Sequence, residues 1–159
     1  MIEPLQFSFE VAVPAERAFT IWTSKFATWW PLDHTVTAER DLTIVLEPRL
    51  GGRLYERTVD GSEYEWGEIT GWDPPRGFSY LWHLRADRSD ATDVELSFVP
   101  IGAKSTRIEL LHSGWDRLGA GGEDGRDRNT GGWRSLMPHY LAAVDESMTE
   151  QEEKGERNE

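Results

Sequence analysis

The sequence contains no cysteine, few basic residues and no long apolar run. The absence of cysteine excludes disulfides, thiolate metal sites and thiol nucleophiles. Lys and Arg together number 17 against 29 Asp and Glu, and the formal net charge of −12 disfavours binding to phosphate backbones and anionic membranes. Neither a leader-like opening nor an apolar run of about 18 residues occurs. We therefore expect a cytoplasmic protein that binds no nucleic acid and does not insert into a membrane.

The four histidines lack the spacing of a metal site. No two of them are separated by the two or four positions that place ligands on one face of a strand or helix. The sequence also has no Walker sequence, no serine-nucleophile motif and no paired carboxylates of the kind that hydrolases use. We expect neither a metal nor a cofactor.

Tryptophan, by contrast, is unusually abundant. The chain has eight in 159 residues, although a close-packed core is mostly built from branched aliphatic side chains. An indole is large and carries an N–H that needs a partner when it is buried. We interpret the tryptophans as an aromatic wall that lines a cavity; the alternative, that several are half-exposed edge residues, stays open. The eight positions are Trp22, Trp29, Trp30, Trp66, Trp72, Trp82, Trp115 and Trp133.

The first forty residues predict one strand followed by short helices. Apolar and polar residues alternate over 5–11, which is the period of a half-buried strand. Pro14 suits the first turn of a helix, and apolar residues at helical spacing continue to about Thr23. A second apolar run ends at Pro31, and 32–40 is predicted to be a loop.

Turn residues then divide the chain into six short strands. Asp60-Gly61 is a strong hairpin signal, and prolines and glycines separate several of the other strands. Connections of hairpin length predict an antiparallel meander. The predicted strands are 42–47, 53–59, 64–72, 78–84, 94–98 and 106–112.

The remaining residues predict a loop and then a helix. The segment 113–132 holds seven glycines and many charges, which predicts a mobile loop that acts as a lid over a pocket. From Trp133 onward, apolar residues follow helical spacing for about three turns, with Pro138 producing a local bend. We place the folded domain at 1–147 and an acidic, disordered tail at 148–159.

Together these elements predict an α+β fold: a curved seven-stranded antiparallel sheet around a long C-terminal helix, with one or two short helices after the first strand. The last helix is the only long amphipathic element available to cover the apolar face of the sheet. A strongly twisted sheet touches a single helix along a limited line. We therefore expect a cavity between the sheet and the helix.

A series of short motifs also occurs in an order typical of one family. They are VPAERAF at 13–19, WWPL at 29–32, EPRLGGRLYER at 47–57, WGE at 66–68, WDPP at 72–75, TRIEL at 106–110, HSGW at 112–115 and GW at 132–133. Over roughly 5–146 the chain resembles the START-like (SRPBCC) superfamily, and within it the group named after the activator of the 90-kDa heat-shock chaperone ATPase. The resemblance implies a helix-grip fold with a pocket, and relatives that bind lipids, sterols, polyketides or other apolar molecules, a minority of them enzymes.

The candidate site residues lie on the predicted inner faces of the strands and on the last helix. His112 is the one candidate for catalysis, because strand alternation places it inward, beside the glycine-rich segment. Alternatively, His112 is a structural residue that caps the end of its strand through backbone hydrogen bonds. The predicted ligand-binding residues are Trp30, Tyr80, Trp82, His112, Trp133 and Met137, followed by Trp66 and Tyr140.

The strand at 64–72 has two faces, and the sequence does not decide between them. If Trp66 and Trp72 line the pocket, Glu68 lies inside as well and needs a cationic partner. If instead Gly67 and Ile69 face the helix, Glu68 lies on the solvated outer face.

Three functions follow from these patterns. The leading hypothesis is a non-enzymatic binder of a small apolar or aromatic molecule. A second is a small cyclase, dehydratase or isomerase that acts on an apolar carbonyl compound with His112 as its acid–base group. A third is a module that contacts a chaperone or regulator through its outer surface or acidic tail. Exposed sheet edges also allow a homodimer, although no interface signature is present.

Overall fold

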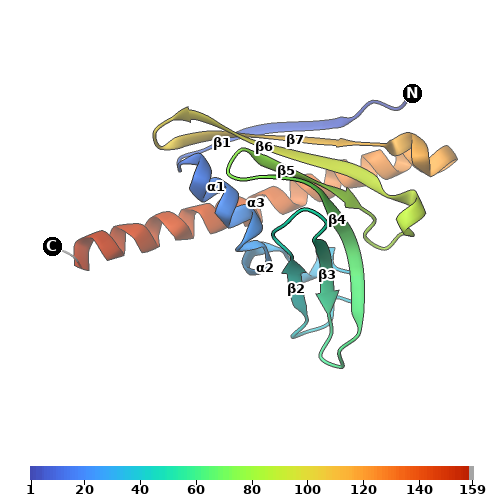
Figure 1. The fold of residues 1–159 in the computed structure, drawn as a ribbon, viewed down its shortest axis with the longest axis horizontal. Coiled ribbons are helices and arrows are strands. Elements are labelled where there is room, and N and C mark those ends of the chain that lie inside the picture. The colour runs from blue at the N-terminus through green and yellow to red at the C-terminus, as the bar shows by residue number, and fades with distance from the viewer. Residues whose placement is uncertain (158–159) are drawn as a thin grey trace.

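The computed structural model describes the backbone of residues 1–157 and the side chains of 1–150. Seven antiparallel strands form one curved sheet in the order β1-β7-β6-β5-β4-β3-β2, and the long helix α3 runs along it (Figure 1). The predicted α+β helix-grip architecture is therefore confirmed. The strands are β1 Leu5–Val11, β2 Thr43–Leu46, β3 Arg53–Arg57, β4 Glu63–Asp73, β5 Gly77–Trp82, β6 Thr92–Gly102 and β7 Ser105–Ser113. The helices are α1 Ala15–Thr23, α2 Phe26–Trp29, η1 Leu32–His34, η2 Arg88–Asp90, η3 Trp115–Gly121 and α3 Gly122–Arg157, where η marks a 3₁₀ helix.

The first strand pairs with the last, so β1 forms one edge of the sheet and β2 forms the other. Leu5 lies opposite His112 and Val11 opposite Thr106. Between β1 and β2 the chain forms α1 and α2, whose buried faces pack with α3 and β6 into the core. The sheet therefore presents one apolar face, covered by α1, α2 and α3.

Most of the tryptophans pack against other aromatic rings in this core. The ring centroids of Trp22 and Trp29 are 5.2 Å apart with an interplanar angle of 70°, and those of Trp30 and Trp66 are 5.6 Å apart. Trp22 and Trp66 have no exposed surface. The Trp22–Trp29 pair is edge-to-face, and a pair of this kind stabilises by about 0.5–1.5 kcal/mol beyond the area it buries. The space beneath the middle of α3 is accordingly filled with rings.

The predicted mobile loop at 113–132 is wrong. This segment forms η3 and the first turns of α3, so the helix begins ten residues before Gly132 and continues through Pro138, whose side chain is exposed. The glycines permit close packing: a Cβ at Gly122 would lie 2.5 Å from the Trp115 carbonyl oxygen, and one at Gly125 would lie 2.8 Å from Leu118 Cδ1. Composition alone cannot distinguish glycines needed for close approach from glycines that give a loop its mobility.

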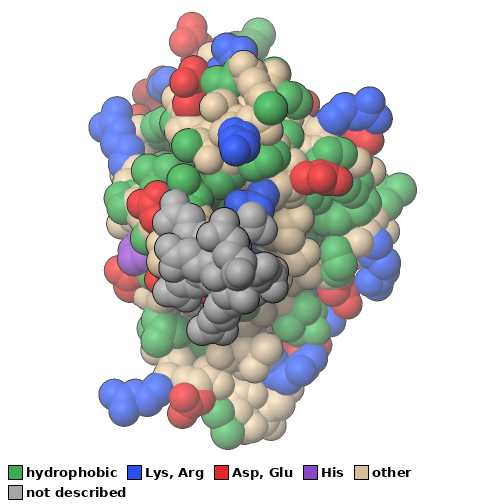
Figure 2. All heavy atoms as spheres, turned by 90° about the vertical axis from the view of Figure 1, so that its left-hand side faces the viewer, with side chains coloured by type: hydrophobic (Ala, Val, Ile, Leu, Met, Phe, Trp, Pro, Cys, Tyr) green, Lys and Arg blue, Asp and Glu red, His purple; other side chains and the backbone are tan. Residues whose placement is uncertain are grey.

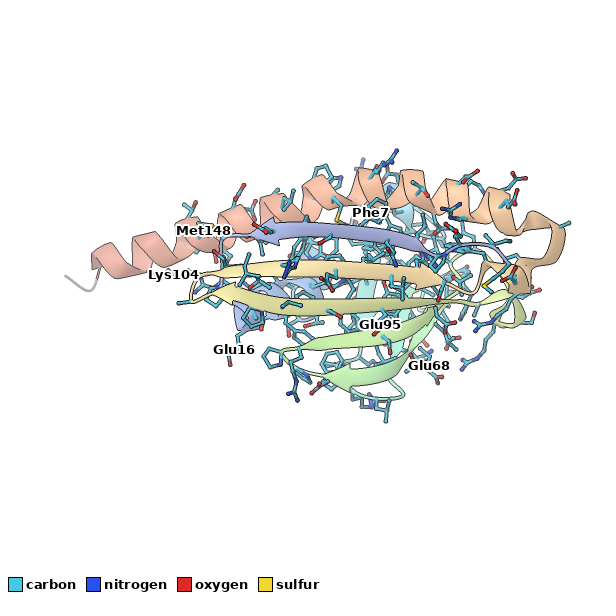
Figure 3. The ribbon with its side chains drawn as sticks, turned by 90° about the horizontal axis from the view of Figure 1, so that it is seen from above. Phe7, Glu16, Glu68, Glu95, Lys104 and Met148 are labelled. Atoms are coloured by element: carbon cyan, nitrogen blue, oxygen red, sulfur yellow. The ribbon has the colours of Figure 1, made fainter. Side chains whose placement is uncertain are left out.

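The predicted tail, 148–159, begins inside α3, because the helix continues to Arg157. Residues 158–159 lie outside the described part of the chain. In Figures 1 and 3 the C-terminal part of α3 extends past the end of the sheet. On the face seen from that end, acidic and basic side chains are interspersed with hydrophobic ones (Figure 2).

Two irregularities in β4 answer the question of its faces. The pairing shifts register at Leu54/Tyr55 on the β3 side and at Ile69/Gly71 on the β5 side. Trp66 and Ile69, three positions apart, are therefore both buried in the core. Glu68 lies on the outside, where its carboxylate is 2.7 Å from Arg88 Nη2. The aromatic face and the Ile69 face thus both contribute to the core, because a bulge resets the alternation.

None of the helices within the described residues combines the length and apolarity needed to cross a membrane.

Candidate ligand-binding cleft

A cleft of about 440 Å³ opens between the first half of α3, the β5–β6 connection and the segment that follows α2. Its aromatic and aliphatic walls come from Trp30, Trp82, Leu84, Trp115, Leu118, Trp133 and Leu136. Its polar lining comes from Asp33, His34, His83, Arg85, Asp90, Thr92, Arg128 and Asn129. An apolar wall with a few polar groups at defined places is typical of a small-molecule site.

A second hollow, of about 590 Å³, lies over β1, β7 and β6. Four of its lining residues, Gln6, Ser8, Glu95 and Glu109, have exposed side chains. Glu95 is labelled on the side of the sheet away from α3 in Figure 3. Phe7 is the single aromatic residue in its described lining, so this hollow is a weaker candidate despite its larger volume.

Hydrogen bonds donated by the indole N–H groups hold three of the four cleft tryptophans in place. Trp30 Nε1 donates to the His34 carbonyl oxygen at 3.0 Å. Trp115 Nε1 donates to the His112 carbonyl oxygen, and Trp133 Nε1 donates to His112 Nδ1, both at 3.0 Å. The rings are therefore pre-positioned, which lowers the entropy that a ligand must offset on binding.

His112 lies directly behind this wall and has no exposed surface. Its Nδ1 accepts the Trp133 N–H, so in the neutral ring the proton belongs to Nε2. Nε2 then donates to Thr92 Oγ1 at 2.7 Å, and the Thr92 hydroxyl donates to the Trp82 carbonyl oxygen at 3.3 Å. Both ring nitrogens are occupied, which fixes the tautomer.

Burial lowers the pKa of His112 to about 3, because the interior disfavours the charged imidazolium. A histidine with both nitrogens bonded and so low a pKa is poorly suited to accept a proton near neutral pH. The geometry favours the structural alternative, through side-chain hydrogen bonds rather than the backbone cap expected from the sequence.

A family model, described as activator of Hsp90 ATPase homolog 1-like protein, matches residues 12–144. The chain belongs to this family. This match confirms the resemblance seen in the ordered motifs. No curated protein matches the chain significantly.

Solved structures share both sequence and fold with this Hsp90-activator-like chain. An anthrahydroquino-gamma-pyrone synthase, Txn09, is 36% identical, with a TM-score of 0.56; the match covers 77% of this chain and 84% of that one. The self-sacrificing resistance protein CalC from Micromonospora echinospora is 25% identical, with a TM-score of 0.66 and coverage of 91% and 96%. An Hsp90 activator from Plasmodium falciparum, at 21% identity and a TM-score of 0.60, shares the fold over 89% of this chain and 95% of its own.

Within this family member, three of the eight predicted ligand-binding residues line the cleft: Trp30, Trp82 and Trp133. The other five lie behind it or beside it. Trp66, Tyr80, His112 and Tyr140 are enclosed in the core, and Met137 is half-buried against the core without lining the cleft. Tyr140 donates its hydroxyl to the Ala18 carbonyl oxygen at 2.8 Å, so that group already has a partner.

The polar lining was missed by sequence reasoning, and Arg85 shows why. Its backbone φ is +60°, a left-handed conformation that is uncommon outside glycine. Its guanidinium donates to the carbonyl oxygens of Thr35 and Asp33. The connection after β5 is thereby tied to the segment after α2 by a contact across 50 residues, which no local pattern signals.

His34 lies on the same side of the cleft. Burial is the main cause that lowers its pKa; Asp33 opposes this shift, and Arg85 and His139 add to it. Among the described residues, no group of three His, Asp or Glu side chains is arranged to hold a metal ion.

Glu56 on β3 anchors the segment after η1 from behind. It has no exposed surface, yet no cationic side chain among the described residues pairs with it. Its carboxylate accepts hydrogen bonds from Val36 N at 2.6 Å, Thr37 N at 3.0 Å, Thr37 Oγ1 at 2.7 Å and Trp66 Nε1 at 2.8 Å. The carboxylate thus joins β3, β4 and this segment at one point.

Proposed function

We propose that this protein binds a planar aromatic molecule bearing oxygen substituents, in the cleft between α3 and the β5–β6 connection. The observation that carries the proposal is the pairing of four tryptophans with a ring of hydrogen-bonding groups around about 440 Å³. Indole faces and edges favour flat rings. Hydroxyl and carbonyl groups on such a ligand would meet Thr92, Arg128 and Asn129 on the polar lining.

The similarity to the synthase supports this ligand class. The name of that protein describes a fused anthrahydroquinone and gamma-pyrone, which is a flat ring system with phenolic and carbonyl oxygens. At 36% identity the two chains share much of their sequence as well as their fold. In our proposal, the ligand of this protein is likewise a flat aromatic molecule with oxygen substituents.

A titration with 1,2-dihydroxyanthraquinone, followed by calorimetry and by quenching of tryptophan fluorescence, tests the proposal. A ligand of about 18 non-hydrogen atoms gains roughly 0.3 kcal/mol per atom, or about 5 kcal/mol in all. The expected dissociation constant is therefore on the order of 0.1 mM or lower. Absence of both heat and quenching would overturn the proposal.

Two adjacent helical glycines provide a blocking variant and a matched control. Gly132 lines the cleft and Gly131 does not, and a Cβ would meet no atom within 4 Å at either position. Gly132→Leu should fill part of the cleft and weaken binding at least about tenfold, whereas Gly131→Leu should leave binding unchanged. Both substitutions replace glycine in a helix and should stabilise it by up to about 1 kcal/mol, so loss of folding will not mimic loss of binding. Equal affinity in the two variants would place the ligand elsewhere.

A further inference from the structure

His83 is the second histidine beside the cleft, and its setting is the opposite of that of His112. It follows the last residue of β5, is 6% exposed and belongs to the residues that line the cleft. Its Nε2 is 3.1 Å from Glu65 Oε2 on β4. Glu65 is held in turn by Arg88 Nη1 at 3.4 Å, and Arg88 Nη2 reaches Glu68 at 2.7 Å.

The carboxylate determines which nitrogen of His83 carries the proton. An ionised carboxylate only accepts hydrogen bonds, so Nε2 must be the donor, and in the neutral ring Nδ1 is then an unprotonated acceptor. Within the described part of the chain, Nδ1 of His83 has no hydrogen-bond partner. The described side-chain nitrogen and oxygen atoms that are both buried and without a partner are Trp22 Nε1, Arg107 Nε and Arg126 Nε. Nδ1 of His83 is not one of them, so it is accessible to solvent.

A base oriented by a carboxylate and open on its other nitrogen is the arrangement used for proton transfer. His112 has no such open nitrogen, since Trp133 and Thr92 occupy both. Glu65 lies in a neighbouring hollow lined by Tyr64, Arg85 and Asp87, whereas His83 lines the cleft. The imidazole therefore connects a carboxylate outside the cleft to the space inside it.

We infer that His83, oriented by Glu65, is a proton acceptor for the ligand, and that the cleft removes a proton from a phenolic or enolic oxygen of the molecule it holds. This inference rests on the proposed function, because it needs a ligand in the cleft. The ligand O–H bond breaks, an N–H bond forms at Nδ1, and the electron pair stays on the ligand oxygen. The imidazolium is stabilised by Glu65, and its proton passes to water when the ligand leaves.

Other charged groups beside the cleft influence the same equilibrium. Arg85 and Arg128 line the cleft and favour the anionic ligand, as does Arg88, which contacts Glu65. Asp33 and Asp90 oppose it, and His34, whose pKa is lowered mainly by burial, lines the cleft as well. A test must therefore compare variants that differ at His83 or Glu65 alone.

The colour of 1,2-dihydroxyanthraquinone provides the readout, because its phenol and phenolate absorb at different visible wavelengths. The dye is bound to the full-length protein, with occupancy fixed by calorimetry, and its spectrum is recorded from pH 5 to 8. At a given pH, the phenolate-to-phenol ratio of the bound dye should be at least about tenfold higher in the wild type than in His83→Gln, as expected for loss of one nearby positive charge.

Glu65 is a positioning residue and has a matched control on the same strand. Glu65→Gln keeps an acceptor for Nε2 but removes the charge that stabilises the imidazolium, so the ratio should fall between those of the wild type and His83→Gln. Glu68 also pairs with Arg88 but does not contact His83, and Glu68→Gln should leave the ratio unchanged.

The two proposals fail in different ways. If the wild type does not bind the dye, the proposed function is overturned and this inference falls with it. If the dye binds but has the same phenolate-to-phenol ratio in the wild type and His83→Gln, only the proton-acceptor role is overturned. A loss of affinity in His83→Gln without a change in that ratio would likewise reduce His83 to a contact residue.

Discussion

Glu56→Gln is a stringent test of how the segment after η1 is held in place. The glutamate accepts four hydrogen bonds, two at each oxygen: Val36 N and Trp66 Nε1 at Oε1, and both donors of Thr37 at Oε2. A glutamine keeps one oxygen and replaces the other with an amide NH₂, which is itself a donor. One pair of donors therefore loses its acceptor.

The magnitude follows from these contacts. The Thr37 hydroxyl can rotate to accept from the new amide, but the Thr37 N–H is left without a partner, at a cost of about 1–3 kcal/mol. The two bonds at the remaining oxygen lose their charge assistance, at about 1 kcal/mol each. Relief of the buried charge offsets part of this sum. We expect Glu56→Gln to lower the free energy of unfolding by about 2–4 kcal/mol at pH 7.

The effect of the substitution should also depend on pH. Burial acts to raise the pKa of Glu56, but the bonds from Val36, Thr37 and Trp66 outweigh it, so the pKa lies below its ordinary 4.5. The stability contributed by the carboxylate is present above pH 4.5 and is lost as the pH falls through the folded-state pKa. A protonated glutamate carries a donor just as glutamine does. The difference between wild type and variant should therefore shrink in acid.

Urea denaturation followed by tryptophan fluorescence, at several pH values between 7 and 3, measures this difference. Glu63→Gln is the control, because that carboxylate pairs with Arg53 and Arg57 at the surface, and its loss should change stability very little. A Glu56→Gln protein as stable as the wild type at pH 7 would refute the reasoning. So would a deficit that stays constant down to pH 3.

Two further substitutions test the wall of the cleft and the bulge in β4. His112→Asn should lower the free energy of unfolding by about 3 kcal/mol or more, because the shorter side chain does not reach Thr92 and leaves part of the space of the ring empty. Because the pKa of His112 is lowered to about 3 in the folded wild type, the unfolded chain takes up a proton below pH 6.5 that the folded chain does not. As the pH falls from 6.5 to about 3, this group should therefore lower the free energy of unfolding by about 1.4 kcal/mol per pH unit. Denaturation measurements on the variant should lack that pH dependence. Gly67→Ala makes a Cβ clash with the Leu81 carbonyl oxygen and should lower the free energy of unfolding by at least about 2 kcal/mol, measured by thermal or urea denaturation. An unchanged midpoint would show that the bulge relaxes freely.

Local patterns correctly predicted the elements whose geometry depends on residues close to them in the sequence. The alternation over β1 and the Asp60-Gly61 turn between β3 and β4 specify extended chain and reversal without any distant contact. The predicted order of seven strands and a long final helix agrees with the structure for that reason. The helix stripe from Trp133 to Val144 is equally local, and both residues are buried.

Features that depend on packing between distant segments were predicted poorly. Gly122 and Gly125 suggested a mobile loop, although they allow α3 to approach Trp115 and Leu118 closely. The tryptophans suggested one wide cavity, although four of the eight line the cleft, three others are buried in the core, and Trp72 packs half-buried against it. Strand alternation does not predict the burial of His83, because this residue lies past Trp82, where β5 ends.

Hydrophobic period and turn chemistry act within a few residues, so the amino-acid order is enough to predict a curved sheet around a C-terminal helix. The position of the open space, and the polar groups that border it, depend instead on contacts between distant segments. A cleft is the volume that side chains from distant segments leave unfilled. The hydrogen-bond partners of each imidazole likewise depend on which strands and helices meet. His83 is next to Glu65, whereas His112 is held by Trp133 and Thr92.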